Sequence, residues 1–307
     1  MKICPKRLAL IPVLVAATLS LAQDSLSGAM TQAFRGRRGA AVILDIETGK
    51  VVASQDMDRA ARRVVRPGSA LKPFVLATFA DNGLVDESHG VRCTRDLTVG
   101  GRKLNCGHPI SASPFRAEEA LAYSCNTYFT RMGARLTPTQ LRDGLLRWSL
   151  TSRTGLHKNE ATGSVVLSGS PERLQLQSIG EENVLVTPLG LLNGYRKLAI
   201  ELRSRNALAQ THQVVFRGLE SATEYGMSRL AQPEDATLHG KRLRVAGKTG
   251  TSMAAEGPWT HAWFVGYAPA ENPEIVLVVY LENGAGPIDA APIARELFSA
   301  WAREESR

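Results

Sequence analysis

The sequence contains few aromatic residues and only a modest excess of charge of one sign. Phenylalanine, tryptophan and tyrosine make up 6% of the 307 residues, and the formal net charge is +8 at pH 7. No stretch interleaves basic with aromatic residues, the pattern that favours nucleic acid, so we expect no nucleic-acid partner. The mild positive charge suits an anionic polymer as a partner, and it suits equally well a soluble surface rich in arginine.

Long apolar runs are missing beyond residue 22, so nothing later in the chain predicts a membrane-spanning helix, which needs ~20 apolar residues. The apolar run at residues 8–22 follows a positively charged start and closes with small residues. This pattern is typical of an export signal cleaved before Gln23, with an uncleaved N-terminal anchor as the alternative. We therefore expect residues 1–22 to be a signal peptide or anchor. The protein would be exported, either periplasmic or at the outer face of the cytoplasmic membrane.

Cysteine is scarce, with four residues in the chain. Cys4 lies in the expected signal and Cys125 in a motif described below, which leaves Cys93 and Cys106 on either side of a turn-like Val-Gly-Gly sequence. In an oxidising compartment this arrangement predicts a Cys93–Cys106 disulfide, with unpaired thiols as the alternative. His108 follows closely, but no fourth ligand is evident nearby in the sequence, so we expect no metal.

Secondary-structure patterns place strands near both ends of the chain and helices in the middle. The polar residues 23–39 predict a linker to a domain over residues 40–307, into which a mostly helical subdomain, residues 84–240, is inserted. Strands from both ends imply one sheet assembled from both termini, in an α/β (α+β) fold. The predicted elements are a hairpin at 40–46 and 51–54, helices at 69–82, 116–128, 188–202, 221–231 and 289–303, and strands at 243–251, 261–268 and 275–282.

A serine and a lysine, Ser69 and Lys72, stand three residues apart at the start of a predicted helix. This spacing puts both side chains on one face, so the amine can reach the hydroxyl. Serine needs a base to act as a nucleophile, and lysine can serve if burial and a second cation, here Lys248, lower its pKa. The helix N-terminus also directs backbone N–H groups at an oxyanion formed there. Alone, the same pattern is also typical of a capping serine beside a solvated lysine.

The triplet Ser124, Cys125 and Asn126 supplies a hydroxyl that can relay a proton and a carboxamide that can hold a peptide amide. It follows an amphipathic segment, residues 117–123, that can insert it into a cleft. A second match at residues 204–206 lies in an arginine-rich stretch typical of a solvated helix end, so we reject it. For Cys125 we favour a small buried filler over a reactive thiol.

A third motif, Lys248-Thr249-Gly250-Thr251, continues a predicted strand. Alternate side chains face one way along a strand, and Gly250 allows a ligand to approach the backbone. Lysine and threonine there can bind a substrate carboxylate. Each motif alone also suits ordinary structure, but the three in this order favour acyl-transfer chemistry.

The ordered motifs resemble those of the penicillin-recognising serine acyl-transferases, which include penicillin-binding proteins and β-lactamases. The wider match, over about residues 40–301, is similar to the transpeptidase domain of penicillin-binding proteins. It is carried by Pro67 to Phe74, by Tyr128-Phe129 after the Ser-Cys-Asn triplet, by Val186 to Leu189 and by His261 to Pro269. The resemblance implies a β-lactamase/transpeptidase-like fold: a five-stranded antiparallel sheet flanked by helices, beside a mostly helical subdomain, with the cleft between them.

The resemblance also implies a role for each motif residue. Ser69 would be the acylated nucleophile, Lys72 its base and Ser124 the proton relay. The substrate-binding residues would be Asn126 for an amide, and Lys248, Thr249, Gly250 and Thr251 around the carboxylate, with the Ser69 and Thr251 amides forming the oxyanion hole. The implied substrate is the D-Ala-D-Ala end of a peptidoglycan stem peptide, β-lactams would be inhibitors, and no cofactor is needed. Cell-wall synthesis proteins are the partners that it suggests.

The leading hypothesis is therefore a peptidoglycan D,D-transpeptidase. A D,D-carboxypeptidase would use the same acyl-enzyme with water as acceptor, whereas a β-lactamase needs an activating Glu with an Asn partner, which we do not find at the right spacing. A non-catalytic penicillin-binding scaffold or sensor is the non-enzymatic alternative. The chain departs from the family at Gly180-Glu181-Glu182, where Gly-Gln-Gly is usual. We also expect it to be without the N-terminal pedestal or glycosyltransferase domain of large members.

Overall fold

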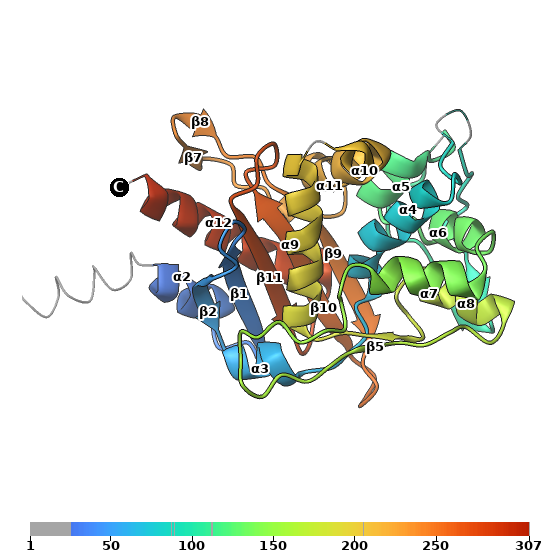
Figure 1. Ribbon diagram of the computed structural model, residues 1–307, viewed down its shortest axis with the longest axis horizontal. Coiled ribbons are helices and arrows are strands. Elements are labelled where there is room, and N and C mark those ends of the chain that lie inside the picture. The colour runs from blue at the N-terminus through green and yellow to red at the C-terminus, as the bar shows by residue number, and fades with distance from the viewer. Residues whose placement is uncertain (1–25, 87, 89, 112, 205, 307) are drawn as a thin grey trace, which may run out of the picture.

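A five-stranded antiparallel sheet forms the centre of one half of the molecule in the computed structural model, which describes residues 26–86, 88, 90–111, 113–204 and 206–306. The strand order is β2-β1-β11-β10-β9, so strands from both ends of the chain lie side by side (Figure 1). The strands are β1 (Gly39–Asp45), β2 (Val51–Gln55), β9 (Ala246–Met253), β10 (Thr260–Ala268) and β11 (Ile275–Leu281). The predicted sheet and its assembly from both termini are confirmed.

Both faces of this sheet are buried, which explains why its central strands are apolar throughout rather than alternating. Along β1, Val42 faces one core and Ile43 the other, and in β11 Val278 and Val279 divide in the same way. Val42 pairs with Val278 in the antiparallel register. Each fully buried valine or isoleucine stabilises the fold by about 1.5–3 kcal/mol, so register is strongly specified.

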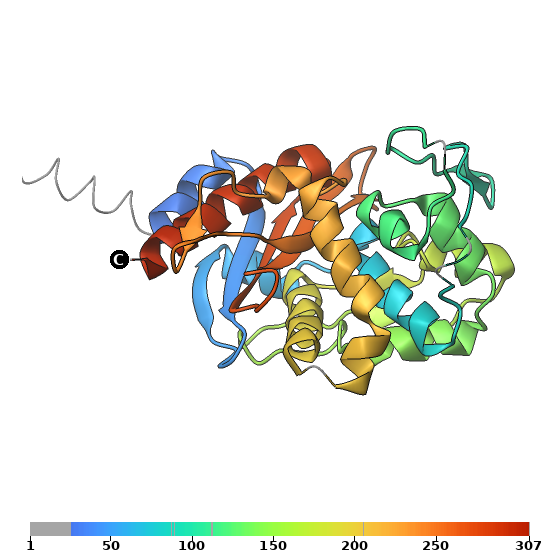
Figure 2. The same ribbon diagram turned by 90° about the horizontal axis from the view of Figure 1, so that it is seen from above.

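Helices cover both faces of the sheet (Figure 2). The first face carries α2 (Leu26–Phe34) and α12 (Ala291–Glu305), and the second carries α9 (Pro188–Ser204). The expected linker over residues 23–39 is therefore wrong for its described part, because α2 buries Met30 and Phe34 in the core. The Leu26 N–H also donates to the Glu304 carboxylate of α12 (3.1 Å). Residues 1–22 lie outside the described residues.

The other half of the molecule is mostly helical and packs against the second face through α9 and α4 (Lys72–Asp81) (Figure 1). Its remaining helices are α5 (Ala117–Ala122), α6 (Asn126–Gly133), α7 (Pro138–Leu146), α8 (Pro171–Gln177), α10 (Ala207–Thr211) and α11 (Gln213–Glu224), whereas α3 (Met57–Arg62) lies beside β1. Three pairs of two-residue strands are also described: the hairpins β3 (Thr98–Val99) with β4 (Arg102–Lys103) and β7 (Thr237–Leu238) with β8 (Lys241–Arg242), and the pair of β5 (Ser164–Val165) with β6 (Val184–Leu185), between which α8 lies in the chain. Among the described residues, no helix is long and apolar enough to cross a membrane.

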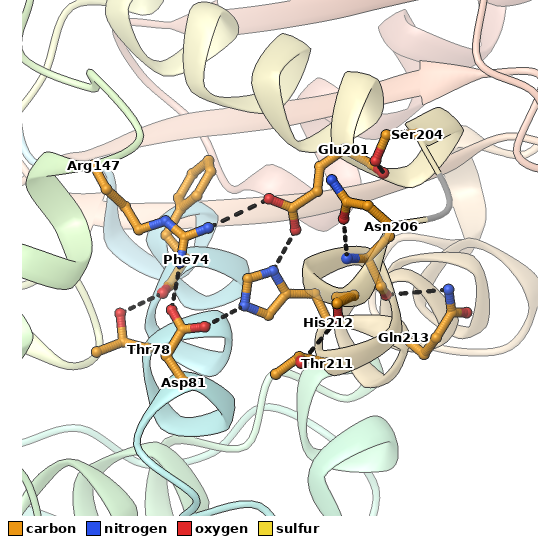
Figure 3. Close-up of polar contacts among 12 residues, drawn as sticks. Phe74, Thr78, Asp81, Arg147, Glu201, Ser204, Asn206, Thr211, His212 and Gln213 are labelled. Atoms are coloured by element: carbon orange, nitrogen blue, oxygen red, sulfur yellow. Dashed lines mark hydrogen bonds and ion pairs between the residues drawn. The ribbon is translucent and has the colours of Figure 1, made fainter.

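A buried polar cluster joins this helical half to α9 (Figure 3). His212, which is fully buried, lies between two carboxylates: its Nε2 is 2.8 Å from Asp81 at the end of α4, and its Nδ1 bonds to Glu201 of α9. Arg147 bonds to the same two carboxylates. Burial alone would lower the pKa of His212, but the hydrogen bonds and charges of the two carboxylates raise it to about 9. The cluster therefore holds a charged histidine at neutral pH.

Candidate active site

The candidate nucleophile, Ser69, lies in a 3₁₀ turn, η1 (Gly68–Leu71), that leads into α4. The turn is pressed against β9. Gly68 has φ of +52°, and a Cβ placed there would lie 2.4 Å from the Thr251 carbonyl oxygen, so only glycine fits. Pro67 and Gly68 thus direct the chain out of the sheet and into the helix. Ser69 is half-buried while Ala70 is fully buried.

Lys72 begins α4 and is fully buried. Its Nζ lies 2.8 Å from the Ser124 carbonyl oxygen, 3.2 Å from Ser124 Oγ and 2.7 Å from Asn126 Oδ1. The ring of Phe129 lies 5.2 Å from the same amine, a distance at which a cation is attracted by the aromatic face. The first and second motifs are therefore in direct contact through the lysine.

The second motif occupies a break between α5 and α6, where the sequence predicted one helix over residues 116–128. Ser124 has φ of +58°, and the Cys125 N–H donates to the Ala120 carbonyl (2.9 Å), which closes α5 in the manner of a Schellman motif. Asn126 then starts α6. A left-handed serine is uncommon, and this one turns the Ser124 and Asn126 side chains into the interior cleft.

The third motif lies on β9, which is an edge strand of the sheet. Thr249 and Thr251 line the cleft, whereas Lys248 is fully buried and its Nζ bonds to the Thr249 carbonyl (3.0 Å). A Cβ on Gly250 would lie 2.7 Å from the Pro67 carbonyl and 2.9 Å from the Ala70 nitrogen. Gly250 is therefore required so that the serine turn can pack on the strand, in addition to leaving its backbone open to the cleft.

A cavity of about 360 Å³ brings most of the predicted site residues together. Six of them line it: Ser69, Ser124, Asn126, Thr249, Gly250 and Thr251. The other two, Lys72 and Lys248, are buried and do not line it. The two amines therefore lie behind the residues that form the cavity wall. In this position Lys248 does not contact the cavity directly, whereas the resemblance implied that it binds the substrate carboxylate.

Burial dominates the electrostatics of the two amines. Burial lowers the pKa of Lys72 to about 8, although the charges of neighbouring groups, including Glu181, act to raise this pKa. Burial also lowers the pKa of Lys248 well below its ordinary value, and the charge of Lys72 lowers it further. The sequence argument invoked Lys248 as the cation that depresses the pKa of Lys72, but desolvation is the main cause. A substantial fraction of Lys72 is neutral just above neutral pH, as a general base requires.

Two residues beside the site, Ser228 and Glu181, were not predicted as site residues. Ser228 donates to Thr249 Oγ1 (3.3 Å) and accepts from the Thr249 N–H (3.0 Å), which fixes this threonine. Glu181 lines the cavity and forms an ion pair with Arg102 (2.9 Å). Burial raises the pKa of Glu181 in spite of the arginine. In the sequence, only the unusual Gly180-Glu181-Glu182 segment pointed to Glu181. No local sequence pattern indicates that Ser228 lies beside the site.

The loop around Gly180 is held against the serine turn. The Gly68 N–H donates to the Gly180 carbonyl (3.1 Å), and a Cβ on Gly180 would lie 2.2 Å from the Gly68 carbonyl. Gly180 also has φ of +74°. This close approach places Glu181 beside the candidate nucleophile.

The cysteines next to the site differ from the expected disulfide. Cys93, Cys106 and Cys125 are all free and buried, and the Sγ atoms of Cys93 and Cys106 lie 3.5 Å apart. A disulfide bond is about 2 Å long, so these two thiols are neighbours without a covalent link.

The geometry as a whole suits acyl transfer to a serine. A half-buried hydroxyl opens on a cavity, a buried amine lies three residues further along, and hydroxyl, carboxamide and edge-strand groups surround the space where a substrate would lie. A serine nucleophile with an amine base and a binding strand is the recurring arrangement of the active-site serine acyl-transferases. This is the class that the fold and the site define.

Comparisons with known proteins agree with this class. The family model of the penicillin-binding protein transpeptidase domain matches residues 39–299, so the chain belongs to that family. It is 25% identical to "Probable peptidoglycan D,D-transpeptidase PenA" of Neisseria flavescens, covering 91% of this chain and 78% of PenA. It is 26% identical to "Peptidoglycan D,D-transpeptidase PbpA" of Mycobacterium tuberculosis, covering 81% of this chain but only 57% of PbpA.

A solved structure shares the fold. The Helicobacter pylori penicillin-binding protein PBP2, in its complex with MreC, superposes with a TM-score of 0.78 at 19% identity, over 91% of this chain and 62% of that one. The chain therefore spans somewhat more than half the length of several proteins that it resembles.

Proposed function

We propose that this chain is a peptidoglycan D,D-transpeptidase that forms an acyl-enzyme on Ser69 and is inhibited by β-lactams. The single observation that carries the proposal is the cavity lined by Ser69, Ser124, Asn126 and Thr249–Thr251, above the buried Lys72. Membership of the penicillin-binding protein transpeptidase family and the names of PenA and PbpA support the substrate class. The D-Ala-D-Ala end of a stem peptide is the proposed donor, which places the reaction outside the cytoplasm.

In the proposed acylation, neutral Lys72 accepts the proton of Ser69 Oγ while that oxygen attacks the carbonyl carbon of the penultimate D-Ala. The bond from that carbon to the terminal D-Ala nitrogen then breaks, and the nitrogen receives a proton through Ser124, whose hydroxyl lies 3.2 Å from Lys72 Nζ. An acceptor amine next attacks the Ser69 ester, forms the cross-link and restores the serine. In a β-lactam the broken amide is part of the ring, so the leaving nitrogen stays attached to the acyl group.

Substrate binding is proposed to use the open edge of β9. An edge strand has unpaired backbone groups to which an extended peptide can add, and the Thr249 and Thr251 hydroxyls lie along it. These hydroxyls would bind the substrate carboxylate directly. Lys248, buried below, donates to the Thr249 carbonyl (3.0 Å) and would therefore act on the substrate by fixing this strand. Asn126 would hold the amide of the donor.

A second function, hydrolysis of the acyl-enzyme as in a D,D-carboxypeptidase, is favoured by one observation. Glu181 lines the same cavity, and burial raises its pKa, which makes its carboxylate a better general base for water near neutral pH. Transpeptidation and hydrolysis share every step up to the ester. The balance between amine and water as acceptor would then depend on this residue.

The first test is time-resolved labelling of the full chain with a fluorescent penicillin, comparing wild type with Ser69→Ala. We expect label that depends on Ser69 and persists for many minutes. Rapid loss of label would indicate a β-lactamase, and an absence of label on wild type would contradict the proposal and favour a non-catalytic scaffold. Product analysis on a stem peptide, with and without an amine acceptor, then separates transpeptidase from carboxypeptidase.

The Glu181 proposal has a matched control in the adjacent residue. Glu182 bonds to Arg173 and does not line the cavity. Glu181→Gln should lower the ratio of hydrolysis to transfer, while Glu182→Gln should leave it unchanged. An equal ratio in both variants would remove Glu181 from the mechanism. We also propose a protein partner in the cell wall machinery, since the H. pylori relative was solved in a complex with MreC.

A further inference from the structure

Three thiols and one imidazole meet in a buried cluster directly behind the Ser124–Asn126 motif. Cys93, Cys106, His108 and Cys125 each place a ligand-type atom within 4.8 Å of the others, and all four residues are buried. The first three come from the segment around the β3–β4 hairpin, and Cys125 comes from the break between α5 and α6. The fourth ligand that the sequence did not reveal is thus the cysteine inside the motif.

The imidazole is held with one nitrogen free to bind. His108 Nδ1 lies 2.7 Å from the Pro109 carbonyl, so this nitrogen carries the proton and donates it to that oxygen. The other nitrogen, Nε2, is buried with no hydrogen-bond partner in the described part of the chain, and the residue is only 1% exposed. A donor bond that fixes the tautomer and leaves a lone pair free is the usual preparation of a metal-ligating histidine.

Two of the three sulfur atoms accept backbone hydrogen bonds, as thiolate ligands do. The Arg95 N–H donates to Cys93 Sγ (3.3 Å) and the Asn126 N–H donates to Cys106 Sγ (3.2 Å). The Cys93 thiol itself donates to Thr127 Oγ1 (3.2 Å). Hydrogen bonds to the charged form of a ligand favour that form and orient it.

A disulfide accounts for these groups less well than a metal ion does. Three thiols cannot all pair within one chain, and a Cys93–Cys106 bond would leave Cys125 and the free His108 nitrogen unexplained. The observed separation of 3.5 Å between Cys93 Sγ and Cys106 Sγ is close to the ~3.8 Å that two thiolates have on one tetrahedral zinc ion, given a zinc–sulfur distance of ~2.3 Å.

We propose that Cys93, Cys106, His108 and Cys125 bind one Zn²⁺ ion in a closed, tetrahedral Cys₃His site. This ligand set is typical of structural zinc, which needs no open position and adds to folding stability directly. The site would tie the β3–β4 hairpin to the α5–α6 break. Because Cys125 stands between Ser124 and Asn126, the ion would hold the left-handed Ser124 backbone in place and keep both side chains directed at Lys72.

The experiment measures metal in the purified full chain by elemental analysis, without added metal. We expect about one zinc per chain in the wild type, and loss of that zinc in Cys106→Ser and in His108→Ala. The matched control is His239→Ala, since His239 is an exposed histidine outside the cluster, and it should retain zinc as the wild type does. His108→Cys should also retain it, because a Cys₄ set binds zinc equally well.

If the ligand variants fail to fold, the wild type alone still decides the question. Chelator treatment under reducing conditions should remove the zinc and lower the thermal unfolding midpoint, and zinc should restore it. Cobalt added to the metal-free chain should produce the intense absorption of a tetrahedral thiolate site. Zinc that persists in both ligand variants, or a metal-free wild type whose mass shows a disulfide and which takes up no cobalt, would overturn the proposal.

The effect on acylation rests on the proposed function, whereas metal content and thermal stability do not. Removal of zinc should slow penicillin labelling at Ser69 while Ser69→Ala keeps its zinc. A chain that binds zinc without ever being labelled would refute the proposed function and leave the metal site standing. Full labelling rates in a folded, zinc-free chain would instead refute the role of the ion in positioning the motif.

Discussion

Lys72 Nζ and Asn126 Oδ1 lie 2.7 Å apart, although 53 residues separate them in the chain and they begin two different helices. The contact is partly buried, and it leaves Lys72 donating to Ser124 as well. One amine thereby connects the candidate nucleophile turn to the motif on the opposite side of the cleft. Any change that moves α6 relative to α4 should therefore alter the chemistry at Ser69.

Lys72→Ala should reduce penicillin acylation by about 10²–10⁴-fold, the range for loss of a general acid or base. The reason is that no other amine both contacts Ser124 and stands three residues from Ser69 among the described residues. Stopped-flow labelling measures the rate, and Lys158→Ala, which changes an exposed lysine, is the control. A rate equal to wild type would assign the base to another group.

The acylation rate should rise with pH and level off above about pH 8. Burial lowers the pKa of Lys72 to about 8, and only the neutral amine can accept the serine proton, so activity is gained as pH increases through that value. A pH profile of the second-order labelling rate between pH 6 and 10 tests this. A rate that is constant across the range, or that falls with pH, would contradict Lys72 as the base.

His212→Gln should lower the free energy of unfolding at neutral pH, and the loss should be smaller at alkaline pH. The folded pKa of about 9 lies above the ordinary 6.5, so the charged histidine stabilises the folded state fully below pH 6.5, and this contribution is lost as pH rises through 9. The shift corresponds to about 3 kcal/mol as an upper limit. Denaturant unfolding at pH 6.5 and 9.5 tests it, with His239→Gln as the control. A deficit that does not shrink at high pH would contradict the charge argument.

Gly250→Ala should impair acylation more than it impairs folding. A Cβ at this position would lie within 3 Å of the Pro67 carbonyl and the Ala70 nitrogen, so the turn that carries Ser69 must shift away from β9. Displacement of the reacting atom by about 1 Å can cost about 10²-fold in rate. Labelling rate and thermal midpoint should be compared with Gly169→Ala, because a Cβ at that exposed position would have open space around it. Unchanged labelling by Gly250→Ala would show that the turn does not need this contact.

Elements with regular periodicity could be predicted from the sequence, and long-range packing could not. The strands at 243–251, 261–268 and 275–282 agree with β9, β10 and β11 to within a few residues, and the agreement is closest for β11, which is an apolar run rich in β-branched residues. The helix predicted over 116–128 is two helices instead. The left-handed Ser124 is held in part by Lys72, which lies 52 residues away in the chain, and no local pattern contains that contact.

Residue types and their order determined the chemistry of the site. The motifs are a serine and a lysine three residues apart, a Ser-x-Asn and a Lys-Thr-Gly. Their residue types alone indicate a nucleophile, an amine and polar ligands, and their order was sufficient to indicate the family. Polar composition alone misled at residues 26–34, since α2 has enough apolar residues on one face to pack on α12.

Only the tertiary structure decided how buried each group is and which distant groups meet. Burial, which sets the pKa of Lys72 and removes Lys248 from the cavity, depends on every segment that packs around them. The contact of Cys125 with Cys93, Cys106 and His108 likewise joins segments that the sequence keeps apart. Local sequence specifies what a side chain can do, whereas desolvation and proximity are properties of the folded chain as a whole.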